Sequence, residues 1–189
     1  FDALHSVARL FQLWAAKQVL GIAGTNLCLH ICSRRTARPH WKLCPRCGVM
    51  VEDCRHVLHC QEANRVDCML KSIDRLETWL REQNTEPRLK TALIKYAKGR
   101  GGLSMRTAAC GLGSMFGRLA ASQDQIGWRR FMEGMVSKEV VEIQQAHFNL
   151  WRIKKSATSW AQDLVIKLLE ITHGQWLYRN VQVHDAAQG

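Results

Sequence analysis

Four residues between positions 44 and 60 have the types and the spacing of a metal site. Cys44 and Cys47 are separated by two residues, and His56 and Cys60 follow with three residues between them. Two thiolates at the first spacing can turn toward one ion, and residues four apart on a helix project from the same face. Three sulfurs and one imidazole complete a tetrahedral shell that suits Zn²⁺ and leaves no position for a reactive water. The sequence therefore predicts a structural zinc site.

The residues around the ligands favour the same geometry. Pro45 stiffens the turn between the first two cysteines, and Gly48 permits the left-handed backbone conformation that ends it. Two neighbours are rival ligands. Cys54 would point away if it shares a helix with His56, and His59 would break the four-residue spacing.

The other cysteines receive a different interpretation. Cys28 and Cys32 are also four residues apart, and together with His40 they could form half of a second site. No Cys-x-x-Cys pair accompanies them, so core-facing thiols are the favoured interpretation. Cys68 and Cys110 lie within helical patterns and are expected to be buried thiols. Dense cysteine and histidine without a secretion signal favours an intracellular compartment, nucleus or cytoplasm, over a disulfide-bonded secreted scaffold.

The charge balance indicates a polyanionic partner. Lysine and arginine number 27 against 16 aspartates and glutamates, a net charge of +11. An excess of this size favours nucleic acid, either RNA or DNA, because cations that neutralise phosphates release counterions. A bound metal would hold the neighbouring cations in place against a phosphate backbone. The candidate nucleic-acid-binding residues are Arg34, Arg35, Arg38, Trp41, Lys42, Arg46 and Arg55.

Trp41 has two interpretations that the sequence leaves open. Its ring could stack on a base beside the basic residues, or it could cover the metal loop as a hydrophobic plug.

Motifs for catalysis are missing from the sequence. The glycine-rich segment 99–106 lacks the GxxxxGK[ST] pattern of a phosphate-binding loop, so it is interpreted as a basic turn. Neither GxSxG nor HExxH occurs. Asp67, Asp74 and Glu77 follow one face of a predicted helix and are expected to be solvated. Since the one strong metal site has a closed shell, we expect no catalysis.

Hydrophobic periodicity predicts a mostly α-helical protein with an inserted zinc knuckle. Helical spacing covers 3–20, 27–32, 66–81, 87–98, 107–122, 126–135, 137–151 and 159–181. Ser122 and Gln125 match a capping box for the helix that begins near Ile126. Strand alternation is absent except for a possible hairpin at the knuckle, and no apolar run is long enough to span a membrane. We expect residues 1–62 to hold the N-terminal helices and the CCHC knuckle, and residues 63–189 to form a helical region packed on them.

Several segments resemble the zinc-binding domain that follows the reverse transcriptase of non-LTR retroelements. That family typically has a tryptophan-bearing helix, a connector with a threonine, a short helix and the pattern CPxCGxxxExxxHxxxxC. Residues 10–62 carry the likeness, and the matched positions are Trp14, Thr25, Cys44, Pro45, Cys47, Gly48, Glu52, His56 and Cys60. Only three residues separate His56 from Cys60, at a point where the family pattern varies. Trp176, Arg179 and Asn180 match a W-x-x-R-N segment that often lies downstream.

The resemblance implies a non-catalytic accessory module of a longer retroelement-type protein, with a polymerase domain upstream in the same polypeptide. The chain begins with Phe1 rather than Met, which fits a piece of something longer, and it contains no Tyr-x-Asp-Asp box of a polymerase. The first functional hypothesis is a zinc-stabilised module that binds nucleic acid. The alternative is a helical protein-interaction or scaffold module with a purely structural zinc. Its tryptophans could build a docking groove, although at helical spacing such residues more often belong to the core (Trp128, Trp151, Trp160 and Trp176).

Overall fold

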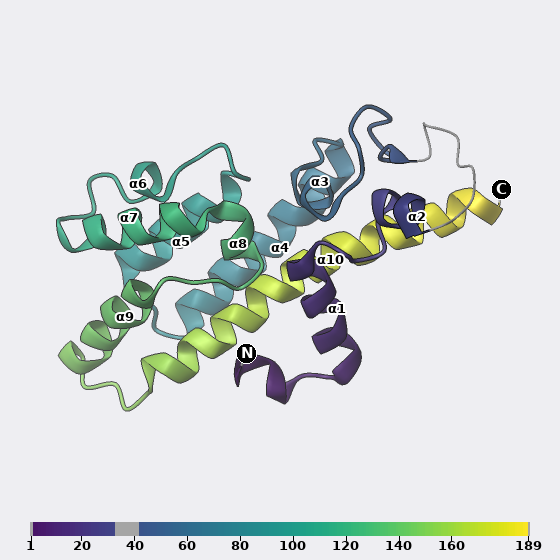
Figure 1. Cartoon of the computed structure of the whole chain (residues 1–189). Coiled ribbons are helices and arrows are strands. Elements are labelled where there is room, and N and C mark those ends of the chain that lie inside the picture. The colour runs from purple at the N-terminus through teal and green to yellow at the C-terminus, as the bar shows by residue number, and fades with distance from the viewer. Residues whose placement is uncertain (1, 33–41, 189) are drawn as a thin grey trace.

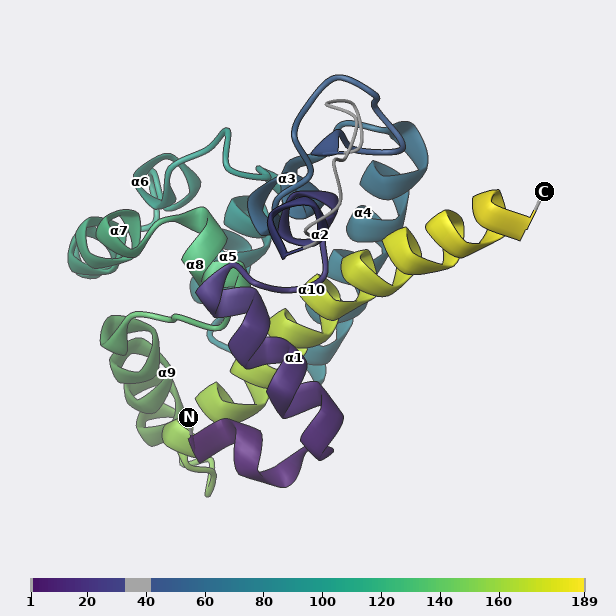
Figure 2. The same cartoon turned by 45° about the vertical axis from the view of Figure 1, so that its right-hand side comes forward.

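The computed structural model describes residues 2–32 and 42–188, which form ten α-helices and one short 3-10 helix (Figures 1 and 2). The elements are η1 (Asp2–Ser6), α1 (Arg9–Leu20), α2 (Asn26–Cys32), α3 (Cys54–His59), α4 (Ala63–Glu82), α5 (Pro87–Lys98), α6 (Met105–Ala108), α7 (Met115–Ile126), α8 (Trp128–Met132), α9 (Lys138–Leu150) and α10 (Ala157–Gln188). Within these described ranges the β-structure is limited to one antiparallel bridge between Leu43 and Val51. The expected fold class, a mostly helical protein with a small Cys/His knuckle, is confirmed.

Helix α10 connects the two ends of the molecule. Its 32 residues extend over about 48 Å at the rise of an α-helix. Figure 1 shows it running from α9, in the cluster of α4 to α9, toward α1 and α2 beside the knuckle. It contacts α4, α9, η1, α3, α8 and α1. The small N-terminal elements are therefore positioned mainly by a helix from the far end of the chain.

The larger core lies where α4, α5, α7, α8 and α9 meet the first half of α10. Buried apolar residues of α4 recur at spacings of four and three, namely Met69, Ile73, Leu76 and Leu80, as the periodicity predicted. Helix α5 begins as expected, with Pro87 in its first turn and the Glu86 carboxylate accepting a hydrogen bond from the Leu89 N–H.

A smaller apolar cluster joins α1 to the middle of α10. Trp14, Ala15 and Leu169 are buried together. The Trp14 ring lies 4.4 Å from the His173 ring and 6.4 Å from the Trp176 ring, measured between centroids. This aromatic contact holds α1 against α10.

The N-terminal helix predicted over 3–20 is divided into η1 and α1. Helix α1 ends at Gly21, whose φ of +76° is a left-handed conformation that glycine adopts without strain. The Cys28 N–H then donates to Thr25 Oγ1 at 3.4 Å, so Thr25 caps α2.

The helix predicted over 107–122 is interrupted, so its continuity is wrong. Helix α6 stops at Ala108, and Gly111 and Gly113 follow with φ of +80° and +106° before α7 begins at Met115. The capping box at Ser122 is also wrong, because that residue lies inside α7 and its hydroxyl donates back to the Arg118 carbonyl. Two glycines in left-handed conformations interrupt the helix that the apolar composition predicted.

Two expectations about single side chains also fail. Cys110 is exposed in the glycine turn after α6, whereas Cys68 is half-buried on α4. Among the tryptophans, Trp128 and Trp160 are buried, but Trp151 follows the end of α9 and is 67% exposed. Among the described residues, no helix is both long and apolar enough to cross a membrane.

Candidate metal centre

The first two cysteines lie in a tight loop that is closed by backbone hydrogen bonds. The Cys44 N–H donates to the Met50 carbonyl at 2.8 Å, and the Glu52 N–H donates to the Lys42 carbonyl at 2.8 Å. At the turn, the Gly48 N–H donates to the Cys44 carbonyl, and Gly48 has the left-handed φ of +66° that the sequence predicted. The possible hairpin at the knuckle is thus this short loop with one bridge.

The second pair of ligands is carried by α3. The Asp53 carboxylate caps this helix by accepting from the His56 N–H at 2.6 Å. Cys60 follows directly after the last turn, and its N–H donates to the His56 carbonyl at 2.7 Å. Their i, i+4 relation therefore places both side chains on one face, toward the cysteine loop.

The four candidate ligand atoms converge on one point. The ligand atoms of Cys44, Cys47, His56 and Cys60 all lie within 4.8 Å of one another. The Cys44 and Cys60 sulfurs are 3.9 Å apart, and the Cys47 sulfur is 3.4 Å from His56 Nε2. Around a tetrahedral ion with ordinary zinc bond lengths, the sulfur–sulfur and sulfur–nitrogen separations would be about 3.8 Å and about 3.6 Å. The predicted ligand set therefore forms a cage of the right size for a metal ion.

Protonation of the ligands depends on burial and on the loop backbone. Burial raises the pKa of the Cys44 thiol to about 11. Burial also acts on Cys47, but the N–H groups of Met50 and Val49 directed at its sulfur outweigh that effect and lower its pKa. Burial lowers the pKa of His56, which favours the neutral imidazole that coordinates metals. A bound cation would supply the positive charge that the buried Cys44 thiolate requires.

Neither nearby rival joins the cage. Cys54 is buried and its sulfur points to the Ala23 carbonyl, 3.9 Å away. His59 makes a 2.9 Å hydrogen bond between Nδ1 and the Arg55 carbonyl. Cys28 and Cys32 also lie outside the four-residue group. His40 falls outside the described residues.

Two arginines that sequence reasoning did not assign to the site hold the end of α3. Arg65 is fully buried and its Nη1 donates to the Val57 carbonyl at 3.2 Å. Arg100 Nη2 donates to the carbonyls of Leu58 and Cys60 at 3.2 and 2.7 Å. Because helix C-termini expose carbonyls, these cations anchor the backbone that carries His56. Arg100 had been placed in a basic turn, and only the fold brings that turn to α3.

A buried carboxylate joins the metal loop to the rest of the protein. Glu52 is fully buried beside the cage, and its Oε2 lies 2.6 Å from Arg179 Nη2 on α10. The same oxygen accepts from the backbone N–H of Asn26 at 3.0 Å. Arg65 Nη2 approaches the other oxygen to 3.9 Å. One anion therefore binds groups from α2, α4 and α10.

Several residues that carried the sequence resemblance meet at this junction. Trp14 packs near Trp176, and Thr25 caps the helix that begins with Asn26. Arg179 reaches both Glu52 and the Asn26 side chain, whose Oδ1 lies 2.7 Å from Arg179 Nη2. The first 62 residues and the C-terminal W-x-x-R-N segment thus share one interface.

The candidate nucleic-acid-binding residues are only partly described. Arg34, Arg35, Arg38 and Trp41 fall outside the described residues. Lys42 is half-buried at the base of the cysteine loop, whereas Arg46 and Arg55 are exposed on the loop and on α3.

A basic cleft of about 270 Å³ lies beside the metal cage. Its walls are Arg55, His59, Gly101, Ile126, Gly127, Trp128 and Arg129. Arg129 lies on α8. Its Nε is held 2.9 Å from Glu133 Oε1, which fixes it at the cleft. Among the described residues Arg55 makes no ion pair, so its charge is available to an anion.

His59 lies at the base of the cleft. Its ring meets the Trp128 ring at a centroid distance of 4.8 Å and an angle of 67°. Burial, together with the positive charges of Arg55, Arg100 and Arg129, lowers the His59 pKa. His59 is therefore neutral at physiological pH, and the positive charge of the cleft comes from the arginines.

Comparisons with protein-family models, with curated proteins and with solved structures give no match to this chain.

Removal of the metal should loosen the knuckle. We expect a strong chelator, or the substitutions Cys47→Ser and His56→Gln, to abolish bound metal and to lower Tm by on the order of 10 °C, since each kcal/mol corresponds to about 2–4 °C in a protein of this size. Metal content measured by mass spectrometry and melting followed by circular dichroism check this. Cys110→Ser and His59→Gln are the matched controls and should retain the metal. Loss of metal in His59→Gln but not in His56→Gln would contradict the ligand assignment.

The Glu52 junction should be sensitive to the loss of one partner. Glu52→Gln leaves Arg179 buried without its anion, and we expect a destabilisation of about 3–5 kcal/mol in denaturant unfolding. The double variant Glu52→Gln with Arg179→Met removes the charges of this ion pair and should recover part of that loss, because Arg65 still lacks its anion. Additive losses in the double variant would show that the two side chains are not coupled.

Proposed function

We propose that the four-residue cage binds Zn²⁺ as a structural ion. Three thiolates with one imidazole at tetrahedral separations form a donor set that zinc prefers over the hard cations Mg²⁺ and Ca²⁺. All four positions of the shell are filled by the protein, and Cys44 and Cys60 are buried. Such a site leaves no position at which the metal could activate water, which supports a non-catalytic role.

The same proposal extends to nucleic acid as the partner. The observation that carries it is the basic cleft beside the cage, where Arg55 and Arg129 come from separate helices. Arg55 directly precedes His56, so a metal bound at His56 fixes the backbone of the cation. Two guanidinium groups facing one cleft suit a phosphate, and the net charge of +11 adds long-range attraction. The remaining candidates, Arg34, Arg35 and Arg38, belong to this proposal on their sequence position alone.

The biological setting we propose is a retroelement-type protein. The chain would be an accessory module of a longer polypeptide, with a polymerase domain upstream. The support is the resemblance of residues 10–62 and of the W-x-x-R-N segment, together with the Glu52–Arg179 ion pair that links these two parts.

Exposed apolar side chains favour the second candidate, a protein-interaction module. Leu10 and Leu20 on α1 are 81% and 71% exposed, and Ile31 on α2 is 71% exposed. At the end of α9, Leu150 and Trp151 are 76% and 67% exposed. An exposed pair of large apolar neighbours such as Leu150 and Trp151 can contact another protein. Under this alternative the zinc is purely structural and the cleft has no ligand.

Charge reversal in the cleft tests phosphate binding. We expect Arg55→Glu to weaken binding of a single-stranded oligonucleotide on the order of tenfold at low salt, and to reduce the slope of log affinity against log salt by about 1. Lys154→Glu makes the same change of charge in the turn between α9 and α10, at the opposite end of the molecule from α3 (Figure 1), and should bind nearly as the wild type does. Fluorescence anisotropy across salt concentrations measures both. A flat salt response of the wild type would contradict phosphate-driven binding.

Reversal of the three arginines before the cage separates the two candidate functions. The variant Arg34→Glu, Arg35→Glu and Arg38→Glu should abolish binding of both RNA and DNA if the basic surface is the nucleic-acid site. Metal content should be unchanged, which shows that the knuckle is intact. Unchanged nucleic-acid affinity would favour the interaction module, and light scattering would then be expected to show a dimer or a partner complex.

A further inference from the structure

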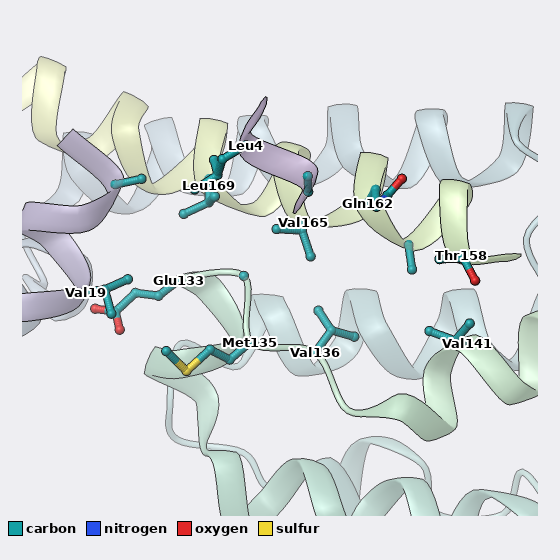
Figure 3. Close-up of a pocket in the computed structure, with 14 residues that line it drawn as sticks. Leu4, Val19, Glu133, Met135, Val136, Val141, Thr158, Gln162, Val165 and Leu169 are labelled. Carbon is teal, nitrogen blue, oxygen red and sulfur yellow. The ribbon is translucent and has the colours of Figure 1, made fainter. Parts of the chain in front are cut away.

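An apolar cavity lies between α10 and the turn that joins α8 to α9 (Figure 3). Its volume is about 400 Å³, which falls within the range of small-molecule sites in proteins. Residues of η1 and α1 contribute to its wall. The cavity does not share a residue with the metal cage or with the basic cleft.

The cavity is elongated along α10. Thr158, Ala161, Gln162, Val165 and Leu169 line it, and spacings of three and four residues place them on a single face of that helix. Leu169 follows Thr158 by eleven residues, which at the rise of an α-helix corresponds to a groove about 16 Å long. Figure 3 shows Val165 and Leu169 on one side of the space, and Met135, Val136 and Val141 facing them. The shape suits an extended chain better than a compact ring system.

Small residues keep this space open. Ala3, Ala15 and Ala161 line the cavity from three different elements. Gly134 adopts a φ of +85°, and a Cβ added there would lie 2.9 Å from Val165 Cγ1. The turn can therefore approach α10 this closely only with glycine. A closely packed interior would carry larger side chains at these positions.

The one carboxylate in the wall of the cavity is already paired with cations. Among the described residues that line it, Glu133 alone is charged, and its side chain is fully buried. Its Oε1 lies 2.9 Å from Arg129 Nε and 3.4 Å from Gln18 Nε2, and its Oε2 lies 2.9 Å from Arg130 Nη1. Both carboxylate oxygens of Glu133 already have partners in the protein, so Glu133 does not need a cationic ligand to neutralise it.

We propose that this cavity binds an uncharged molecule with a single alkyl chain, such as a medium-chain alcohol or ester. The aliphatic residues around Val165 and Leu169 take the chain, because burial of apolar surface drives its binding. Thr158 and Gln162 lie at the opposite end of the lined face and offer hydrogen bonds to the polar head. The proposal is independent of the metal and of nucleic-acid binding.

Displacement of a fluorescent probe tests the class of ligand. The probe is laurdan, an uncharged naphthalene fluorophore that carries a single alkyl chain, titrated into the metal-loaded protein. We expect saturable binding of one probe per chain, and displacement by decanol more readily than by decanoate or decylamine, which share its tail. Non-saturable binding would overturn the proposal. A clear preference for decylamine would also overturn it, since Glu133 would then act as a counterion.

A cavity-filling variant tests the location. We expect Ala161→Phe to weaken probe binding by at least about tenfold, because the ring occupies the space that the ligand needs, while Tm stays equal or rises. Ala121→Phe places the same ring at an exposed alanine of α7 and should bind like the wild type. Ala161→Leu is the milder variant if the phenylalanine disturbs folding. Probe binding by both position-161 variants at wild-type affinity would overturn the assignment of this cavity.

Discussion

A charge removed from water must be neutralised by groups that the fold brings to it, and the Glu52 carboxylate imposes that requirement here. It is fully buried, and its partners come from three helices: Asn26 from α2, Arg65 from α4 and Arg179 from α10. Desolvation of an unpaired carboxylate would cost several kcal/mol, so the loop that carries Glu52 is stable in this position only when those helices are in place. Because Glu52 lies between the two halves of the metal-ligand set, the constraint on its carboxylate also constrains the cage. The aromatic contact of Trp14 with α10 also helps to position this junction, because it holds α1 against the helix that carries Arg179.

The buried cations also connect this junction to the metal ligands. Two arginines face one glutamate, which leaves an excess of one positive charge. A zinc ion with three thiolates would carry a net charge of −1, and the positive field of Arg65 acts on Cys44 and lowers the pKa that burial raises. Arg100 binds the Cys60 carbonyl on the other side of α3. Metal loading and docking of α10 would therefore be coupled through Arg65 and Glu52: a loaded cage would place negative charge near Arg65, whereas α10 brings a second cation, Arg179, to the carboxylate that Arg65 faces.

The sequence predicted the features that depend on local spacing. The four ligands, the Gly48 turn and the Pro87 helix start each depend on residues within a few positions of one another. Their spacing in the sequence was therefore enough to predict them. The break between α6 and α7 was missed because the apolar composition of segment 107–122 favoured a continuous helix. The left-handed conformations of two of its glycines, which end that helix, could not be predicted from composition. Arg65, Arg100 and Arg129 could not be assigned to the site, since their roles depend on helix packing between distant segments. The Glu52–Arg179 ion pair spans 127 positions. The sequence marked both residues only as parts of separate motifs.

The position of the basic cleft follows from these same constraints. Arg55 belongs to the short helix that carries the second half of the ligand set, and Arg100 fastens the end of that helix to the loop before α6. Arg129 is fixed from the other side by Glu133, which also receives Gln18 from α1. A six-residue helix has little stability alone, so without the metal the cleft would lose one wall while Arg129 stayed in place. Phosphate affinity through this cleft would therefore depend on the metal, even though the ion makes no contact with the anion.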